Sequence, residues 1–166
     1  MSELYGVTPA VVIGNQDPEG RGRIQIQFPH IEGMTTAFAR VATMMAGATR
    51  GSWFMPEVGD EVLVAFAYGD VNHPYVVGFL WNQSSPPPSG DPRERLLRSA
   101  NRHEIELYDG VVEQGDAGYV RISDAHGNSV ELSNGQITIS SPGEIHINAP
   151  NVMINARAVL PGAGTI

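Results

Sequence analysis

Pairs of apolar residues, each separated by one polar residue, recur through the second half of the chain. The pairs are Ile105/Leu107, Val120/Ile122, Val130/Leu132, Ile137/Ile139, Ile145/Ile147 and Val152/Ile154. A period of two is typical of a β-strand with one apolar face. From Val130 onward the pairs return every seven or eight residues, and Asn134-Gly135 and Pro142-Gly143 are turn sequences between them. The pattern predicts a repeat of short strands.

A lone ribbon of such strands leaves its narrow apolar edge in water. Copies of the same chain around a symmetry axis can bury that edge. We therefore predict a homotrimer in which three intertwined chains form a β-helical needle over residues 103–166, with Glu131, Thr138, His146 and Asn148 facing outward. The side chains predicted to fill the trimer core are Val130, Leu132, Ile137, Ile139, Ile145, Ile147, Val152 and Ile154.

The first half of the chain has a different pattern, in which strand-like apolar clusters alternate with turn sequences. The clusters lie at residues 11–13, 24–28, 40–42, 62–66 and 75–81. The turns between them include residues 15–20 (NQDPEG) and 69–74 (GDVNHP). Five short strands in one small module predict an OB-fold, a five-stranded Greek-key barrel, over residues 1–81. The predicted fold class is therefore all-β throughout.

Residues 82–102 are predicted to connect the two modules. Pro86, Pro87 and Pro88 stand in succession, which disfavours regular pairing and favours an extended spacer. After them, residues 92–100 predict a short helix, with Pro92 in its first turn and Leu96-Leu97 as its apolar contacts.

Composition excludes several classes of function. The chain has no cysteine, which excludes disulfides, thiolate metal sites and cysteine nucleophiles. Neither a signal peptide nor an apolar run of the ~20 residues that a membrane-spanning helix needs is present, so we expect synthesis in the cytoplasm. A net charge of −8 opposes nucleic-acid binding.

Candidate metal and catalytic motifs are weak. His103-Glu104 resembles the start of a zinc-protease motif, but the position for the second histidine is Leu107, and the alternation predicts the start of a strand. Residues 124–128 (DAHGN) lack the spacing of a calcium loop and predict a hairpin turn. We expect no metal, no cofactor and no enzymatic activity. A glycosidase-like carboxylate pair stays open only among loop residues, namely Asp17, Glu19, Asp60 and Asp70.

An OB-fold module that binds single-stranded nucleic acid is the main alternative function. Such modules combine stacked aromatic residues with a basic groove. The basic residues that favour it are Arg93, Arg95, Arg98 and Arg102, which could equally pair with carboxylates of another chain. The aromatic residues at strand positions are explained by core packing or subunit contact. They are Trp53, Phe54, Phe66, Tyr75, Phe79 and Trp81.

Several segments resemble the spike proteins of contractile injection machines, namely phage baseplate protein V (gpV), the central spikes of phage tails and the VgrG proteins of type VI secretion. The resemblance lies in residues 56–66 (PEVGDEVLVAF) and 69–82 (GDVNHPYVVGFLWN). It continues in residues 102–107 (RHEIEL), 127–132 (GNSVEL) and 135–143 (GQITISSPG). The resemblance implies an OB-fold collar followed by a three-chain β-helix at the tip of a tube that is driven through a membrane.

The resemblance also implies partners. The OB-like part begins almost at Met1, so a separate hub or tube protein is expected at that end. No His-x-His iron motif of the kind seen in some phage spikes is present, which favours a separate PAAR-type tip protein or toxin at the narrow end. The protein would be built into an injection particle or virion and would contact the target membrane only transiently. The predicted tip-docking residues are Leu160, Pro161, Gly162, Ala163, Gly164, Thr165 and Ile166.

Overall fold

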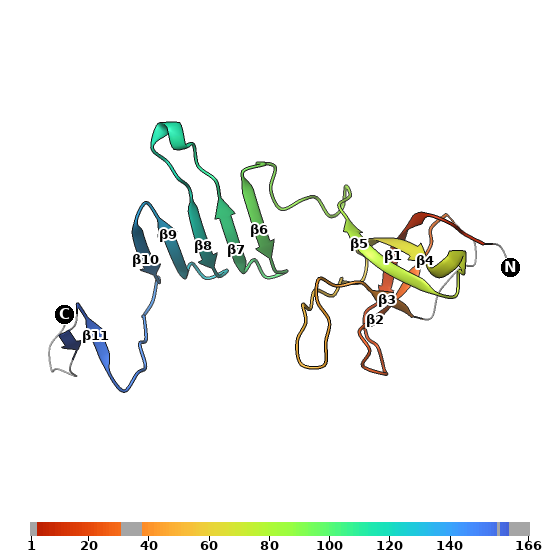
Figure 1. The fold of residues 1–166 in the computed structure, drawn as a ribbon, viewed down its shortest axis with the longest axis horizontal. Helices are drawn as coiled ribbons and strands as arrows, with labels where there is room; N and C mark the ends of the chain where they lie inside the picture. The colour runs from red at the N-terminus through yellow and green to blue at the C-terminus, as the bar shows by residue number, and fades with distance from the viewer. Residues whose placement is uncertain (1–2, 31–37, 156, 160–166) are drawn as a thin grey trace. The chain divides into compact units, whose positions relative to one another are not determined.

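The chain divides into two compact units, Met1–Pro87 and Pro88–Ile166. The computed structural model describes residues 3–30, 38–155 and 157–159, and Figure 1 shows their secondary structure. The division falls within the proline-rich segment. The predicted tip-docking residues, 160–166, lie outside the described part of the chain.

The first unit is a closed five-stranded barrel with the order β1-β2-β3-β5-β4. β3 and β5 pair in parallel, and the other neighbours pair antiparallel. This closed all-β barrel agrees with the predicted OB-fold. Its strands are β1 (Val7–Gly14), β2 (Arg23–Gln27), β3 (Ala39–Val41), β4 (Glu61–Phe66) and β5 (Pro74–Leu80), with a short 3-10 turn, η1 (Ala67–Gly69), before β5.

Alternating apolar residues explain the barrel core. In β4, Val62, Val64 and Phe66 are buried, while the residues between them are half-exposed. The same alternation places Ile24 and Ile26 of β2 in the core. The buried hydrophobic residues are Ala10, Val12, Ile24, Ile26, Phe28, Ala39, Val62, Val64, Phe66 and Val76.

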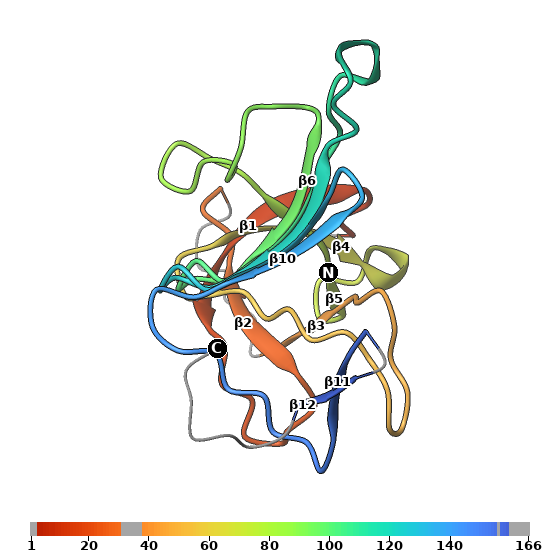
Figure 2. The same cartoon turned by 90° about the vertical axis from the view of Figure 1, so that its left-hand side faces the viewer.

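The second unit contains an antiparallel sheet in which five strands follow one another in sequence order. In Figure 2, which looks along this succession, the strands lie one behind another. The strands are β6 (Glu94–Arg98), β7 (Glu104–Tyr108), β8 (Tyr119–Ser123), β9 (Ser129–Ser133) and β10 (Gln136–Ser140), with a 3-10 turn, η2 (Val112–Gln114), between β7 and β8.

The predicted helix at residues 92–100 is wrong, because Glu94–Arg98 forms the edge strand β6. Every residue of β6 is in register with β7, and Leu97 lies opposite Ile105. Local helix propensity is a weak preference that a neighbouring strand can override. The expected spacer is therefore shorter than residues 82–102.

The turn and the strand predicted after Val130 had different outcomes. Asn134 and Gly135 have φ values of 48° and 76° and join β9 to β10 in a two-residue hairpin, as predicted. The strand expected around Ile145 and Ile147 is absent, because residues 141–151 form neither helix nor strand. Beyond these residues, β11 (Val152–Ile154) pairs antiparallel with β12 (Arg157–Val159).

Candidate functional site: the apolar face of the five-stranded sheet

One face of the β6–β10 sheet carries two continuous rows of aliphatic side chains. The strand registers align these residues across neighbouring strands, so that each row crosses the sheet at right angles to its strands. The first row is Leu97, Ile105, Ile122, Val130 and Ile139. The second row is Leu107, Val120, Leu132 and Ile137, with Arg95 at its β6 end.

This apolar face is open to water in the single chain. Apart from Val130, the exposed fraction of these side chains ranges from 40% for Val120 to 71% for Ile137. Val130 is half-buried. An isolated exposed aliphatic residue is common on protein surfaces, but an unbroken patch of nine is a candidate contact surface.

The opposite face of the sheet is satisfied by its own side chains. Glu106, only 9% exposed, accepts a hydrogen bond of 2.8 Å from the Tyr119 hydroxyl. Arg121 pairs with Glu131 at 2.6 Å and approaches Glu106 at 3.7 Å. Burial, followed by the hydrogen bond to Glu106, raises the pKa of Tyr119 above its ordinary value. The charged side chains of this face are therefore paired within the chain.

Aromatic stacking reinforces the polar face across the strands. The rings of Tyr108 and Tyr119 are stacked with centroids 5.2 Å apart. The guanidinium of Arg93 lies 5.1 Å from the Tyr108 centroid, and that of Arg121 lies 4.2 Å from the Tyr119 centroid. These cation–π and stacking contacts link β7, β8 and the residue that precedes β6. The two faces therefore differ in kind, and the apolar face is the candidate functional surface.

The predicted trimer-core residues fall into three places. Val130, Leu132, Ile137 and Ile139 share the apolar face of β9 and β10. Ile145 and Ile147 lie exposed in the segment without strands. Val152 and Ile154 belong to β11, which is outside the five-stranded sheet. The sheet adds five residues that the predicted core lacked, and all except Leu97 show the same alternation: Leu97, Ile105, Leu107, Val120 and Ile122.

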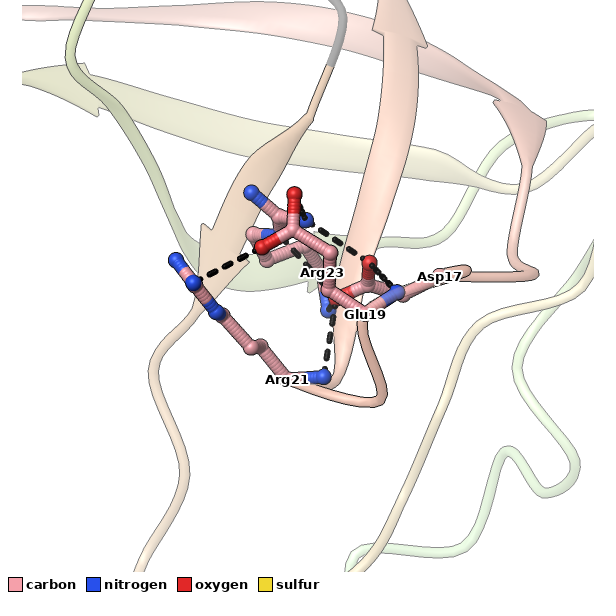
Figure 3. A network of polar contacts seen from close by, with 4 residues as sticks. All are labelled: Asp17, Glu19, Arg21 and Arg23. Atoms are coloured by element: carbon pink, nitrogen blue, oxygen red, sulfur yellow. Dashed lines mark hydrogen bonds and ion pairs between the residues drawn. The ribbon is translucent and has the colours of Figure 1, made fainter.

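A network of hydrogen bonds and ion pairs joins four charged residues where the turn after β1 leads into β2 (Figure 3). The Asp17 side chain, 4% exposed, accepts hydrogen bonds from the backbone N–H groups of Glu19, Arg21 and Arg23. It also accepts bonds from Arg23 Nε at 2.9 Å and Nη2 at 2.8 Å. The Arg23 guanidinium, together with these backbone donors, holds the pKa of Asp17 well below its ordinary range. Asp17 therefore fixes a turn, and its oxygens are occupied.

The other loop carboxylates serve their own turns in the same way. Asp60 accepts from the Glu57 N–H, and Asp70 accepts from the Asn72 N–H and contacts His73. Asp124 accepts from the Asn128 side chain and backbone, which lowers its pKa to about 2. The turn at residues 124–128 joins β8 to β9, as predicted. These bonds do not support a glycosidase-like pair.

Three of the four arginines that favoured nucleic-acid binding, namely Arg93, Arg95 and Arg98, have acidic partners within the chain. Arg93 pairs with Asp91 at 2.7 Å, and Arg95 contacts Asp109. Arg98 donates a hydrogen bond to Glu104. Glu104 is the first residue of β7, so the strand predicted to start after His103 is present. A groove that follows a phosphate backbone needs cationic groups that are available to it.

Among residues 3–30, 38–155 and 157–159, no three or more histidine, aspartate or glutamate side chains are grouped so that they could hold a metal ion. Over those residues there is also no helix with the length and apolar character needed to cross a membrane.

The barrel matches a known family. Residues 8–81 match the model of the type VI secretion system/phage-baseplate injector OB domain. The barrel is therefore similar to the injector OB domain. The match begins in β1 and ends just after β5, so it covers all five barrel strands. The resemblance to VgrG-type and baseplate-type spikes is thereby confirmed.

Individual VgrG proteins are also similar to this chain. The chain is 34% identical over 91 residues to the type VI secretion system spike protein VgrG2a of Pseudomonas aeruginosa, which covers 51% of this chain and 11% of that protein. It is 27% identical over 131 residues to the spike protein VgrG3 of Vibrio cholerae, covering 72% and 13%. It is 25% identical over 192 aligned residues to the actin cross-linking toxin VgrG1 of Vibrio cholerae, an alignment that covers 92% of this chain and 17% of that protein. The chain therefore spans under a fifth of the length of each of these three relatives.

Proposed function

We propose that this protein is the central spike of a contractile injection machine, in which three copies form a rigid needle below a hub. The observation that carries the proposal is the open apolar face of the β6–β10 sheet, next in sequence to an injector OB domain. A face of nine aliphatic side chains on one sheet, with a satisfied polar face behind it, suits one wall of a closed assembly.

An assembly of three sheets accounts for the open edge strands of this sheet better than an assembly of two. β7, β8 and β9 each have both neighbours in the same chain, so other chains can pair only with the edge strands β6 and β10. Two stacked sheets would leave all four edges open, whereas three walls in a ring bring each β10 edge beside the β6 edge of the next copy. Row one then continues from Ile139 of one chain to Leu97 of the next.

This arrangement refines the predicted needle. Over β6–β10 each copy would supply a whole wall, and intertwining of three chains is proposed only for the residues after Ser140. There the segment containing Ile145 and Ile147 lacks a strand partner in its own chain. Backbone groups left unpaired in one chain would pair with those of its two neighbours.

The mechanism proposed is mechanical. A closed, hydrogen-bonded trimer concentrates the force of contraction on a small tip, and stiffness is what the sheet must supply. The cross-strand contacts of Tyr108, Tyr119 and Arg121 on the outer face would resist shear between strands. No catalytic residue, metal or cofactor takes part. The relatives named as spike proteins support a non-enzymatic role, while the one named as a toxin has a length far beyond the aligned part.

The partners proposed are those that the resemblance to injector spikes implies. A hub or tube protein would bind at the OB-fold end, and a PAAR-type tip protein or toxin would bind residues 160–166. The protein would be carried in a phage tail, a phage-tail-like particle or a type VI apparatus. It would meet the target membrane only while crossing it.

Electron microscopy of the assembled particle tests this proposal. A three-fold averaged map of particles with the protein is expected to show a needle at the tube tip, which is lost when its gene is deleted. Truncation after Val159 should keep the needle but lose the tip density. Particles that assemble and penetrate target cells normally without the protein would overturn the proposal.

A further inference from the structure

One end of the barrel gathers exposed apolar side chains. β3 and β5 run parallel and both end there, while β4, antiparallel to β5, begins there. We call it the exit end, because the chain leaves the barrel from it after Trp81. Exposed large apolar side chains lie there on residues 43–55 of the β3–β4 connection and at the end of β5. They are Met44 (82%), Met45 (53%), Trp53 (73%), Phe54 (55%), Phe79 (51%) and, just after β5, Trp81 (68%).

The β3–β4 connection is an ordered finger. Ala46 and Gly51 form a β-bridge, and Ser52 donates its backbone N–H to the Met45 carbonyl at 3.0 Å. The Trp53 ring lies so close to Gly22 that a Cβ there would be 3.1 Å from it. The finger is therefore built to present its apolar side chains, and an exposed tryptophan on an ordered element is a frequent anchor of protein contacts.

We propose that the exit end is an interface between barrels, in which the finger of one copy packs on the β5 end, Phe79 and Trp81, of the next copy. This inference rests on the proposed three-chain spike. Contacts around a three-fold axis join two different surfaces of each copy, and the exit end supplies two.

The chain itself argues for a second copy as the partner. Residues 82–93 join Trp81 to β6, and at ~3.5 Å per residue they span at most about 40 Å. If three sheets share one axis, the three exit ends are held within that reach of it. Tethering of this kind raises the effective concentration of the ends to the millimolar range. The opposite end of the barrel, with Tyr68 94% exposed, remains available to a hub.

The two tryptophans of the chain, Trp53 and Trp81, make the interface measurable without modification. Acrylamide quenching of the purified wild-type trimer, without a hub, is expected to be several-fold weaker than quenching of an Ile139→Asp variant that does not assemble. If a wild-type trimer is quenched as strongly as the unassembled variant, the inference is overturned while the spike proposal stands. A monomeric wild-type protein would overturn both.

Cysteine cross-linking identifies the partner surface, since the chain contains no cysteine of its own. A Met44→Cys/Phe79→Cys variant, oxidised as a trimer, is expected to give a covalent trimer on a non-reducing gel. Each single variant should give none. The control pair Tyr68→Cys/Phe79→Cys should also give none. A trimer whose tryptophans are shielded but whose Met44→Cys/Phe79→Cys pair does not cross-link would show that another surface covers the exit end and would refute the contact proposed.

Discussion

Replacing Ile139 by aspartate should dissociate the spike. Ile139 ends row one of the apolar face and is 59% exposed in the single chain. Full burial of an isoleucine side chain contributes roughly 1.5–3 kcal/mol, so burial of the remaining part contributes about 1–2 kcal/mol per chain, or about 3–5 kcal/mol for three copies. Three unpaired carboxylates at one level of an apolar core would cost several kcal/mol more. Because each 1.4 kcal/mol changes an equilibrium constant tenfold, assembly should weaken by at least 10²-fold to 10³-fold (~3–5 kcal/mol).

Thr138→Asp is the matched control, because Thr138 is the neighbouring residue of β10 and lies on the opposite, polar face. Light scattering after size-exclusion chromatography should find Ile139→Asp as single chains at micromolar concentration and Thr138→Asp as trimers. Circular dichroism would establish that the barrel of each variant is folded. If Ile139→Asp assembles as well as wild type, or if Thr138→Asp dissociates equally, the apolar face is not the trimer core.

Three further predictions concern the rest of the chain. Gly118→Ala should destabilise the protein by at least about 1–3 kcal/mol in urea unfolding, because Gly118 has φ 81° and a Cβ there would lie 1.8 Å from the Tyr108 carbonyl oxygen; Gly143→Ala, with no such contact, should change little, and equal effects would contradict the reasoning. Asp17→Asn should lower the melting temperature at neutral pH. Because the pKa of Asp17 is depressed in the folded state, that difference should be complete above the ordinary value of 3.8 and shrink as the pH falls below it, so a difference independent of pH would count against the Asp17 network. A labelled single-stranded oligonucleotide should show no salt-dependent change in anisotropy, whereas binding at low salt would favour the OB-fold nucleic-acid alternative.

The sequence predicted those elements whose apolar residues alternate and whose partner strand is near in the chain. Val62, Val64 and Phe66 in the barrel and Ile137 and Ile139 in the sheet belong to this class. Alternation states which side chains would share a face, but not whether a neighbouring strand exists. Ile145 and Ile147 show the limit, because they alternate as Ile137 and Ile139 do and yet form no strand in this chain.

β6 and the polar network could not be predicted from the sequence for other reasons. In β6, two adjacent leucines among charged residues give no period of two, and only pairing with β7 places Leu97 on the apolar face. The network of Glu106, Arg121 and Glu131 joins three strands, so no spacing within one segment of the sequence predicts it. Registers between strands, which decide both features, are properties of the folded sheet.

The mass of the wild-type protein in solution tests the central claim most directly. Light scattering across a dilution series is expected to give three times the mass of one chain, unchanged to low concentration, because the apolar faces of three sheets are buried together. A stable, soluble single chain across the same series would contradict the account, since the nine aliphatic residues of the sheet would then have no partner.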